Sequence, residues 1–568
     1  MTPSFLAWQR GLADQAQGFA LWTLAVILCC GVVLVVCWRW QNPTSNPRLF
    51  LRLGIVVMFG GSLLLLLPLP NLLRLAIPAG AFGLVAYAWV DFFRHKPLQI
   101  RIPQVPAMVW IIVGGAALRI PMLILKNPWY DETFTASVVS RSLPDMWRVI
   151  QSDVHPPLFY LVEWVNVRLL GTSPAALRFP AFVCGVVCIY LVYRLAQRFF
   201  WLGYDRRIPY IAAAFAAALP AALNYSNDAR MYSLLSMLVL GAALALIEHK
   251  PRLFMLTTAL IPLTHNLGYL HLAVLGLLAL WFWGRGWIKY VVPGAAAALE
   301  WFPFALGQAH DIADGFWLIT TPADLLQPLQ TMTAGIRVPN QYLLHVTGAI
   351  VALTALSLWT LRSYFHNEWG RMWLALVLGA PLLAAVVSFV WRPVYLDRAF
   401  LPNALLLTLP WAYFLTKINL GDRRTALAVI VPALAVAVVT YFNPAKYYDY
   451  GALISEGCQG TDMIFETKTA GRIISSYYSD LPQVLWTKAN DQTQTLTDDA
   501  KDALGWRQVA DISELHGSVC VLDWFTAHNT LAMDDYMTQL REQFPPVRTV
   551  KLIDEPYFWL NAYVVRLP

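Results

Sequence analysis

The sequence predicts a polytopic α-helical membrane protein with a small C-terminal α/β domain. Hydrophobic residues make up 58% of the 568 residues and charged residues only 13%. Soluble domains carry about 25% charged residues, so this chain has too little charge to cover the surface of a water-soluble protein. Long apolar runs continue to position 442, and shorter apolar stretches alternate with polar ones after it.

Apolar runs recur at the length of a membrane-spanning helix, which needs about 20 such residues; about fourteen runs are present. The segment 253–284 forms either two spans or a broken helix, because Pro262, His265 and Asn266 interrupt its apolar run. We expect extra N-terminal helices in 1–105 and a transmembrane core in 106–442. The runs lie near 20–38, 51–68, 72–93, 107–126, 177–198, 208–223, 231–248, 253–266, 269–284, 289–307, 341–361, 372–390, 399–416 and 425–442.

The net charge of +7 comes from 41 basic and 34 acidic residues, and no dense basic tract is present. We therefore expect no nucleic-acid partner. The basic residues gather in alternate loops, which predicts that those loops are cytoplasmic. The chain is then a multi-pass protein of the inner (plasma) membrane, and its acid-rich loops and C-terminal domain face the periplasm or exterior.

The first long external loop, 127–176, is predicted to contain amphipathic helices at the membrane surface. Pro156 and Pro157 are suited to open such a helix, and apolar residues recur after them at helical spacing. Residues 443–568 instead predict strands near 463–465, 484–486, 519–522 and 563–565 and a helix over 529–544. In this α/β domain Cys458 and Cys520 are expected either to form a disulfide or to be free thiols.

Two acidic motifs occupy the first external loop. Asn127-Pro-Trp-Tyr-Asp-Glu-Thr places Asp131 beside Glu132, and Ser152-Asp-Val-His-Pro-Pro places Asp153 beside His155. Each motif also fits a purely structural role, as the acidic start of a helix or as a capped turn. A carboxylate can accept the proton of an attacking hydroxyl group, which makes Asp131, Glu132 and Asp153 catalytic candidates.

Two further motifs bring arginine to the same predicted membrane face. Arg230 lies near Tyr225 and Asp228 in Asn224-Tyr-Ser-Asn-Asp-Ala-Arg-Met-Tyr, and Arg398 lies near Tyr395 in Pro393-Val-Tyr-Leu-Asp-Arg. Guanidinium groups bind phosphate oxygens as a fork. We predict that these residues bind the substrate and its phosphate. Carboxylates and arginines on one face are typical of group transfer from a lipid phosphate.

In combination, these motifs and the later Ala176-Leu-Arg-Phe-Pro resemble the type C glycosyltransferases. They are most similar to the branch with the protein O-mannosyltransferases and the lipid A aminoarabinose transferase (families 39 and 83). The resemblance covers roughly 107–442. It implies an external active site, a polyprenyl-phosphate sugar donor, inversion at the sugar carbon, and Asp131 as the catalytic base with Glu132 beside it. It also implies that Asp153 and His155 hold the acceptor or the donor phosphate.

The resemblance leaves the sugar and the acceptor open. Val154-His155 before the two prolines is closer to the mannosyltransferases than to the aminoarabinose transferases, which carry Glu-Lys there. The second external loop, 308–340, is too short for the domain that the mannosyltransferases insert. We expect a lipid-linked glycan, an envelope polysaccharide or a lipid as acceptor.

Three alternatives stay open at this level. A transporter or flippase of a lipid-linked glycan would have a similar number of helices, although charges at helix ends and no evident repeat favour an enzyme. The sequence identifies no certain cofactor, but a divalent metal is possible where Asp131, Glu132 and Asp153 converge with His155 or His265. Arg119, inside an apolar run, is either a phosphate ligand or a snorkelling side chain.

Overall fold

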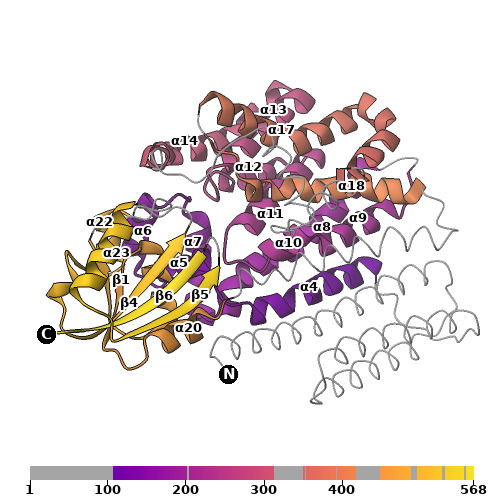
Figure 1. The fold of residues 1–568 in the computed structure, drawn as a ribbon. Coiled ribbons are helices and arrows are strands. Elements are labelled where there is room, and N and C mark those ends of the chain that lie inside the picture. Colours follow the sequence, from indigo (N-terminus) through magenta and orange to yellow (C-terminus); the bar gives the residue numbers. More distant parts are fainter. Residues whose placement is uncertain are drawn as a thin grey trace, which may run out of the picture.

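The computed structural model of the chain (Figure 1) describes residues 106–200, 204–311, 350–351, 353–391, 393–417, 448–487, 496–526, 531–555 and 558–568. The predicted spans at 20–38, 51–68, 72–93 and 425–442 lie outside the described residues, as does part of 341–361. The total of about fourteen spans therefore stays a prediction.

Within the described residues, four helical segments are long and apolar enough to cross a membrane. They are α4 (Ala107–Leu125), α8 (Pro174–Phe199), α17 (Glu368–Val390) and the continuous segment of η4 (Asp397–Phe400) and α18 (Leu401–Lys417). Each coincides with a predicted apolar run. The other helices of this part are α9 (Ile208–Ala218), α10 (Pro220–Tyr225), α11 (Tyr232–Ile247), α12 (Pro251–Leu260), α13 (Gly268–Trp283), η1 (Arg285–Trp287), α14 (Ile288–Asp311) and η3 (Arg362–His366).

The segment 253–284 contains a helix break. Helix α12 ends at Leu260 and α13 begins at Gly268, where an added Cβ would lie 2.7 Å from the carbonyl oxygen of Ile261. The tight turn therefore favours glycine. The freed polar groups bind the first external loop: Leu263 O accepts from the amide of Leu158 at 2.9 Å, and Asn266 Nδ2 donates to Val154 O at 2.9 Å.

That loop folds into three short helices, α5 (Tyr130–Val139), α6 (Leu143–Ser152) and α7 (Leu158–Leu170). Helix α6 is capped by Ser142, whose side chain accepts from the amide of Asp145. Helix α7 starts directly after Pro157, as predicted. One side of α7 is exposed and apolar, which suits a helix at a membrane surface; it carries Val162, Val165, Leu169 and Leu170.

The C-terminal part is an α/β fold built on a six-stranded sheet of order β3-β2-β1-β4-β6-β5. Strands β1 to β4 pair in parallel, whereas β6 runs antiparallel to both β4 and β5. The strands and helix predicted here coincide with β1, β2, β4, β6 and α23. In chain order the elements are α20 (Tyr450–Gly457), β1 (Met463–Glu466), α21 (Thr469–Tyr478), β2 (Gln483–Trp486), α22 (Asp498–Ala503), β3 (Arg507–Val509), η6 (Ile512–Glu514), β4 (Gly517–Thr526), α23 (Leu531–Gln543), β5 (Arg548–Glu555) and β6 (Phe558–Leu567).

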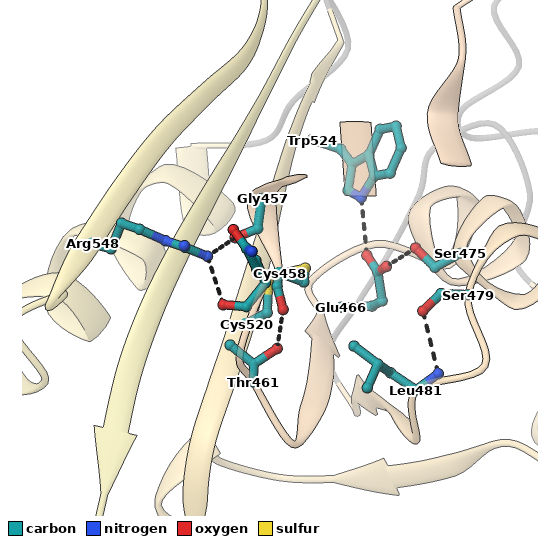
Figure 2. The surroundings of a disulfide bond; sticks show 11 residues. Gly457, Cys458, Thr461, Glu466, Ser475, Ser479, Leu481, Cys520, Trp524 and Arg548 are labelled. Carbon is teal, nitrogen blue, oxygen red and sulfur yellow. Dashed lines mark hydrogen bonds between the residues drawn. A yellow bond between two sulfur atoms is a disulfide. The ribbon is translucent and has the colours of Figure 1, made fainter. Parts of the chain in front are cut away.

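A disulfide joins Cys458 at the end of α20 to Cys520 on β4, which resolves the alternative left open by the sequence (Figure 2). In the same region Glu466 is fully buried and accepts hydrogen bonds from Ser475 Oγ and from Trp524 Nε1, the latter at 2.9 Å. Burial raises the pKa of the Glu466 carboxyl to about 8, although these two hydrogen bonds lower it.

The C-terminal part packs directly on the helices of the first external loop (Figure 1). Phe134 and Val138 of α5 share one buried apolar cluster with Phe465 of β1 and Ile473 of α21. Arg148 of α6 also reaches Asp499 of α22 at 3.4 Å. Helix α5 is therefore covered by the C-terminal part as well as by the transmembrane helices.

Arg119 is neither a phosphate ligand nor a snorkelling side chain. It is fully buried, and its guanidinium group donates to Ser226 Oγ at 3.0 Å, to Gly115 O at 2.7 Å and to Ala217 O at 3.0 Å. Its charge is thus met by oxygen atoms of α4, α9 and the turn after α10, and it ties these helices together.

Candidate active site

Asp131 lies on the first turn of α5 and faces two arginines from distant parts of the chain. Arg398 Nη1 is 3.2 Å from Asp131 Oδ2, and Arg230 Nε is 3.9 Å from the same oxygen. The Asp131 side chain is 15% exposed, so the carboxylate remains accessible although both partners are charged. The structure thus brings together the acid and the two arginines that the sequence predicts for one site.

His155 and Asp153 extend this cluster behind Arg230. Arg230 Nη2 lies 3.2 Å from both ring nitrogens of His155, and His155 Nδ1 lies 3.4 Å from Asp153 Oδ2. Tyr160 donates to Asp153 Oδ2 at 2.6 Å, and Arg230 Nη1 lies 3.5 Å from the Tyr160 hydroxyl oxygen. Because α7 begins after Pro157, its first turn brings Tyr160 back to the loop that holds Asp153.

Burial and charge set the protonation of this group. Burial and the positive charge of Arg230 lower the pKa of His155, so its ring is neutral at pH 7 and one nitrogen can accept from Arg230. Burial raises the pKa of Asp153, but His155, Arg230 and Tyr160 together bring it below its usual value. Burial and the charge of Asp153 raise the pKa of Tyr160, which stays protonated and donates.

Glu132, the neighbour of Asp131, points into a second and fully buried ion network. Its carboxylate accepts two parallel hydrogen bonds from Arg178, from Nε to Oε1 at 2.7 Å and from Nη2 to Oε2 at 2.8 Å. Lys126 lies 3.7 Å from Glu132 and forms an ion pair with Asp228. All four side chains are at most 1% exposed, so two acids and two bases balance one another inside the protein.

This network holds the turn that carries Arg230 against α5. The amide of Ala229 donates to Glu132 Oε1 at 3.1 Å, and Thr135 Oγ1 donates to Ala229 O at 3.1 Å. Lys126 Nζ also donates to Asn227 O at 2.9 Å. The turn is therefore fixed by backbone contacts, which aims the following Arg230 side chain at Asp131.

The two predicted tyrosines lie beside Arg398 and its helix. Tyr225 is buried, and its ring centre is 5.1 Å from that of Tyr232. The guanidinium carbon of Arg398 lies 5.6 Å from the Tyr232 ring centre, which suits a cation–π contact. Tyr395 packs on Phe400 at 5.2 Å, so it supports the segment that carries Arg398.

The described part of the chain contains no ligand cluster for a metal ion: no three His, Cys, Asp or Glu side chains lie close enough together to hold one. Asp131 and Glu132 instead contact arginines. His265, the other proposed ligand, accepts from the amide of Leu267 at 3.0 Å and packs edge-on against His155 at 5.5 Å.

Sequence reasoning did not assign Lys126, Arg178, Tyr160 or Tyr232 to the site. Each lies within or beside one of the motifs described above, but neither hydropathy nor residue spacing shows which side chain it contacts in the folded protein. The available signals were Lys126 at the end of an apolar run and Arg178 near the start of one, since buried cations in such places need an acid nearby.

Known proteins share both sequence and fold features with the chain. Residues 154–306 match the sequence family described as dolichyl-phosphate-mannose-protein mannosyltransferase. The matched segment includes His155, Tyr160, Arg178 and Arg230. No curated protein matches the chain.

The chain also resembles the crystal structure of ArnT from Cupriavidus metallidurans. The apo form is 11% identical with a TM-score of 0.53, and the similarity covers 84% of this chain and 98% of that one. The form bound to undecaprenyl phosphate is 12% identical with a TM-score of 0.53, covering 80% of this chain and 97% of that one. The sequence match and the shared fold indicate a glycosyltransferase with the fold of ArnT. Both findings bear out the resemblance that the motifs predicted.

The four helical segments long enough to cross a membrane, together with the family match and the fold shared with ArnT, support a membrane protein. The family match begins after Asp131 and ends before Arg398. The contact between these two residues therefore comes from the structure and not from the sequence family.

Proposed function

We propose that the chain is an inverting glycosyltransferase that moves a sugar from a polyprenyl-phosphate donor to an extracytoplasmic acceptor, with Asp131 as the base. One observation carries the proposal: an accessible carboxylate lies 3.2 Å from Arg398 and 3.9 Å from Arg230. A base and two phosphate-binding cations are what sugar transfer from a lipid phosphate requires.

The reaction is a single displacement at the sugar carbon. The acceptor hydroxyl oxygen forms the new bond to that carbon while the bond to the donor phosphate oxygen breaks. The Asp131 carboxylate takes the hydroxyl proton, and the phosphate leaves with the electron pair of the broken bond. Attack opposite the leaving group inverts the configuration. Arg230 and Arg398 stabilise the negative charge that grows on the phosphate.

The other predicted residues orient this centre. Asp153 holds His155 and Tyr160, which flank Arg230. Glu132 and Asp228 belong to the buried network and act by fixing α5 and the turn before Arg230. Tyr225 and Tyr395 support the surroundings of Arg398.

The donor and the compartment are part of the proposal. The ArnT structure bound to undecaprenyl phosphate supports a polyprenyl-phosphate donor, because the two chains share a fold. The disulfide supports an oxidising compartment for the C-terminal part, which is the periplasm or exterior of the inner (plasma) membrane. The acceptor is a lipid-linked glycan, an envelope polysaccharide or a lipid.

Asp131→Asn tests the base. The full chain in nanodiscs is expected to bind undecaprenyl phosphate like the wild type, measured by native mass spectrometry, because the arginines remain. Membranes with this variant are expected to lack the glycolipid or glycan that wild-type membranes make, identified by comparing cells with and without the protein. NMR of the product then reports whether the linkage is inverted.

Asp145→Asn is the matched control, because Asp145 is a surface acid of the same loop, and its partners are Arg148 and Ser142. It should keep both binding and product. Near-normal transfer by Asp131→Asn would remove Asp131 from the mechanism. A wild-type chain that binds the lipid and moves it across the bilayer without transferring sugar would instead identify a flippase.

A further inference from the structure

The C-terminal part reaches the segment that precedes the catalytic acid. Tyr478, the last residue of α21, donates its hydroxyl hydrogen to the carbonyl oxygen of Pro128 at 2.7 Å. Pro128 is followed by Trp129, the residue that caps α5, and Asp131 lies on the first turn of that helix. One hydrogen bond therefore links the C-terminal part to the backbone that sets the position of Asp131.

We propose that Tyr478 is a positioning residue for Asp131, so that the C-terminal part takes part in sugar transfer by holding the start of α5. This inference rests on the proposed role of Asp131 as the base. The segment 126–131 is then fixed from two sides. Lys126 is held by Asp228 and Asn227 of the transmembrane part, and Pro128 is held by Tyr478.

A rigid framework lies behind Tyr478. Its ring centre is 6.0 Å from that of Tyr450, which begins α20. The far end of α20 is Gly457, and Cys458 directly after it is bonded to Cys520 of β4 (Figure 2). The helix that Tyr478 contacts through Tyr450 is thus tied covalently to the sheet.

Helix α21 is also bonded to the sheet. Glu466 of β1 accepts from Ser475 on α21 and from Trp524 on β4 (Figure 2). Gly471 makes this close contact possible, since an added Cβ would lie 2.3 Å from Trp524 Nε1 and 2.4 Å from Glu466 Oε2. The body of α21 is thus anchored to the sheet and its last residue contacts α20, which lets Tyr478 hold Pro128 in one place.

The neighbouring tyrosine provides a matched control. Tyr477 also ends α21, but its hydroxyl group donates to Thr172 O at 3.0 Å, beyond the end of α7. Tyr477→Phe and Tyr478→Phe therefore remove the same chemical group from adjacent residues. Only the second removes a contact to the segment before Asp131.

The expected result is a loss in kcat. A single hydrogen bond contributes on the order of 1 kcal/mol, so Tyr478→Phe should lower kcat about fivefold. The KM for the polyprenyl-phosphate donor should stay within about twofold, because Arg230, Arg398 and His155 lie on other segments and a misplaced base affects the transition state more than donor binding. Tyr477→Phe should leave both constants within about twofold. Equal kcat values for the two variants would overturn the proposal.

Amide hydrogen exchange supplies a readout that needs no substrate. In Tyr478→Phe, the amides of Trp129 to Glu132 should exchange faster than in the wild type, while those of β4 should not change. In Tyr477→Phe both regions should match the wild type. Unchanged exchange at Trp129 to Glu132 in Tyr478→Phe would overturn the positioning role, even if the wild type transferred no sugar and the proposed function failed. Thermal unfolding and an intact disulfide establish that both variants are folded.

Discussion

Glu132→Gln should destabilise the protein strongly, because it removes one charge from a buried network of four. Arg178 is fully buried, and its fork to Glu132 has bonds of 2.7 Å and 2.8 Å. Its third nitrogen binds carbonyl oxygens at the end of α4, with Lys126 O at 2.6 Å. Without this carboxylate, Arg178 keeps only neutral hydrogen-bond partners, and the remaining network of Arg178, Lys126 and Asp228 carries one uncompensated positive charge.

The magnitude follows from the burial of both partners. Breaking a buried ion pair by removing one charge costs about 3–5 kcal/mol, a large part of a total stability of about 5–15 kcal/mol. The free energy of unfolding can be followed by titrating the full chain in mixed micelles with SDS. The double variant Glu132→Gln with Arg178→Met should recover much of the loss, because no uncompensated charge remains at that pair.

Asp145→Asn is again the control, since the Asp145–Arg148 pair is 32% and 45% exposed. Water screens the charges of such an exposed pair, so the free energy of unfolding of this variant should stay close to that of the wild type. If Glu132→Gln costs no more than Asp145→Asn, the reasoning from burial is wrong. Arg178→Lys adds a geometric test, because it keeps the positive charge but cannot form the two parallel hydrogen bonds of the guanidinium group. Its free energy of unfolding should lie between those of the wild type and Glu132→Gln.

Three further predictions concern the C-terminal part. Burial raises the pKa of Glu466 from 4.5 to about 8, so the folded chain keeps a proton that the unfolded chain loses. The stability of the protein should therefore fall as the pH rises between these two values. Glu466→Gln can still accept from Trp524 and should remove this fall, measured by thermal unfolding of the full chain. Replacing both Cys458 and Cys520 by Ser opens a link across 62 positions and should lower stability by about 4 kcal/mol in denaturant titration, and an unchanged midpoint would contradict this. Glu542→Cys, at an exposed site, should react with an impermeant maleimide in intact cells, whereas labelling only after lysis would reverse the topology.

The sequence predicted the elements whose signal is local. Apolar runs identify α4, α8 and α17 because a span must be apolar along its whole length. The two prolines before Leu158 identify the start of α7 for a similar reason, since the backbone there is fixed by the residues themselves.

The contacts that build the site are not local and could not be predicted in the same way. Arg398 and Asp131 are 267 positions apart, and Arg178 and Glu132 are 46 apart. The motifs showed that acids and arginines share one face, but not which acid meets which arginine. Nor does hydropathy show that α21 lies on α5, because both helices bury ordinary apolar residues such as Ile473 and Phe134.

Two adjacent acids illustrate why this pairing decides function. Successive residues on an α-helix point about 100° apart, so Asp131 and Glu132 cannot face the same surroundings. The Glu132 side chain is 1% exposed and is already matched by Arg178, whereas Asp131 is 15% exposed and lies at the edge of the cluster. An acceptor hydroxyl can approach only the accessible carboxylate. Helix geometry therefore separates the two adjacent acids into Asp131, the proposed base, and Glu132, which anchors the helix.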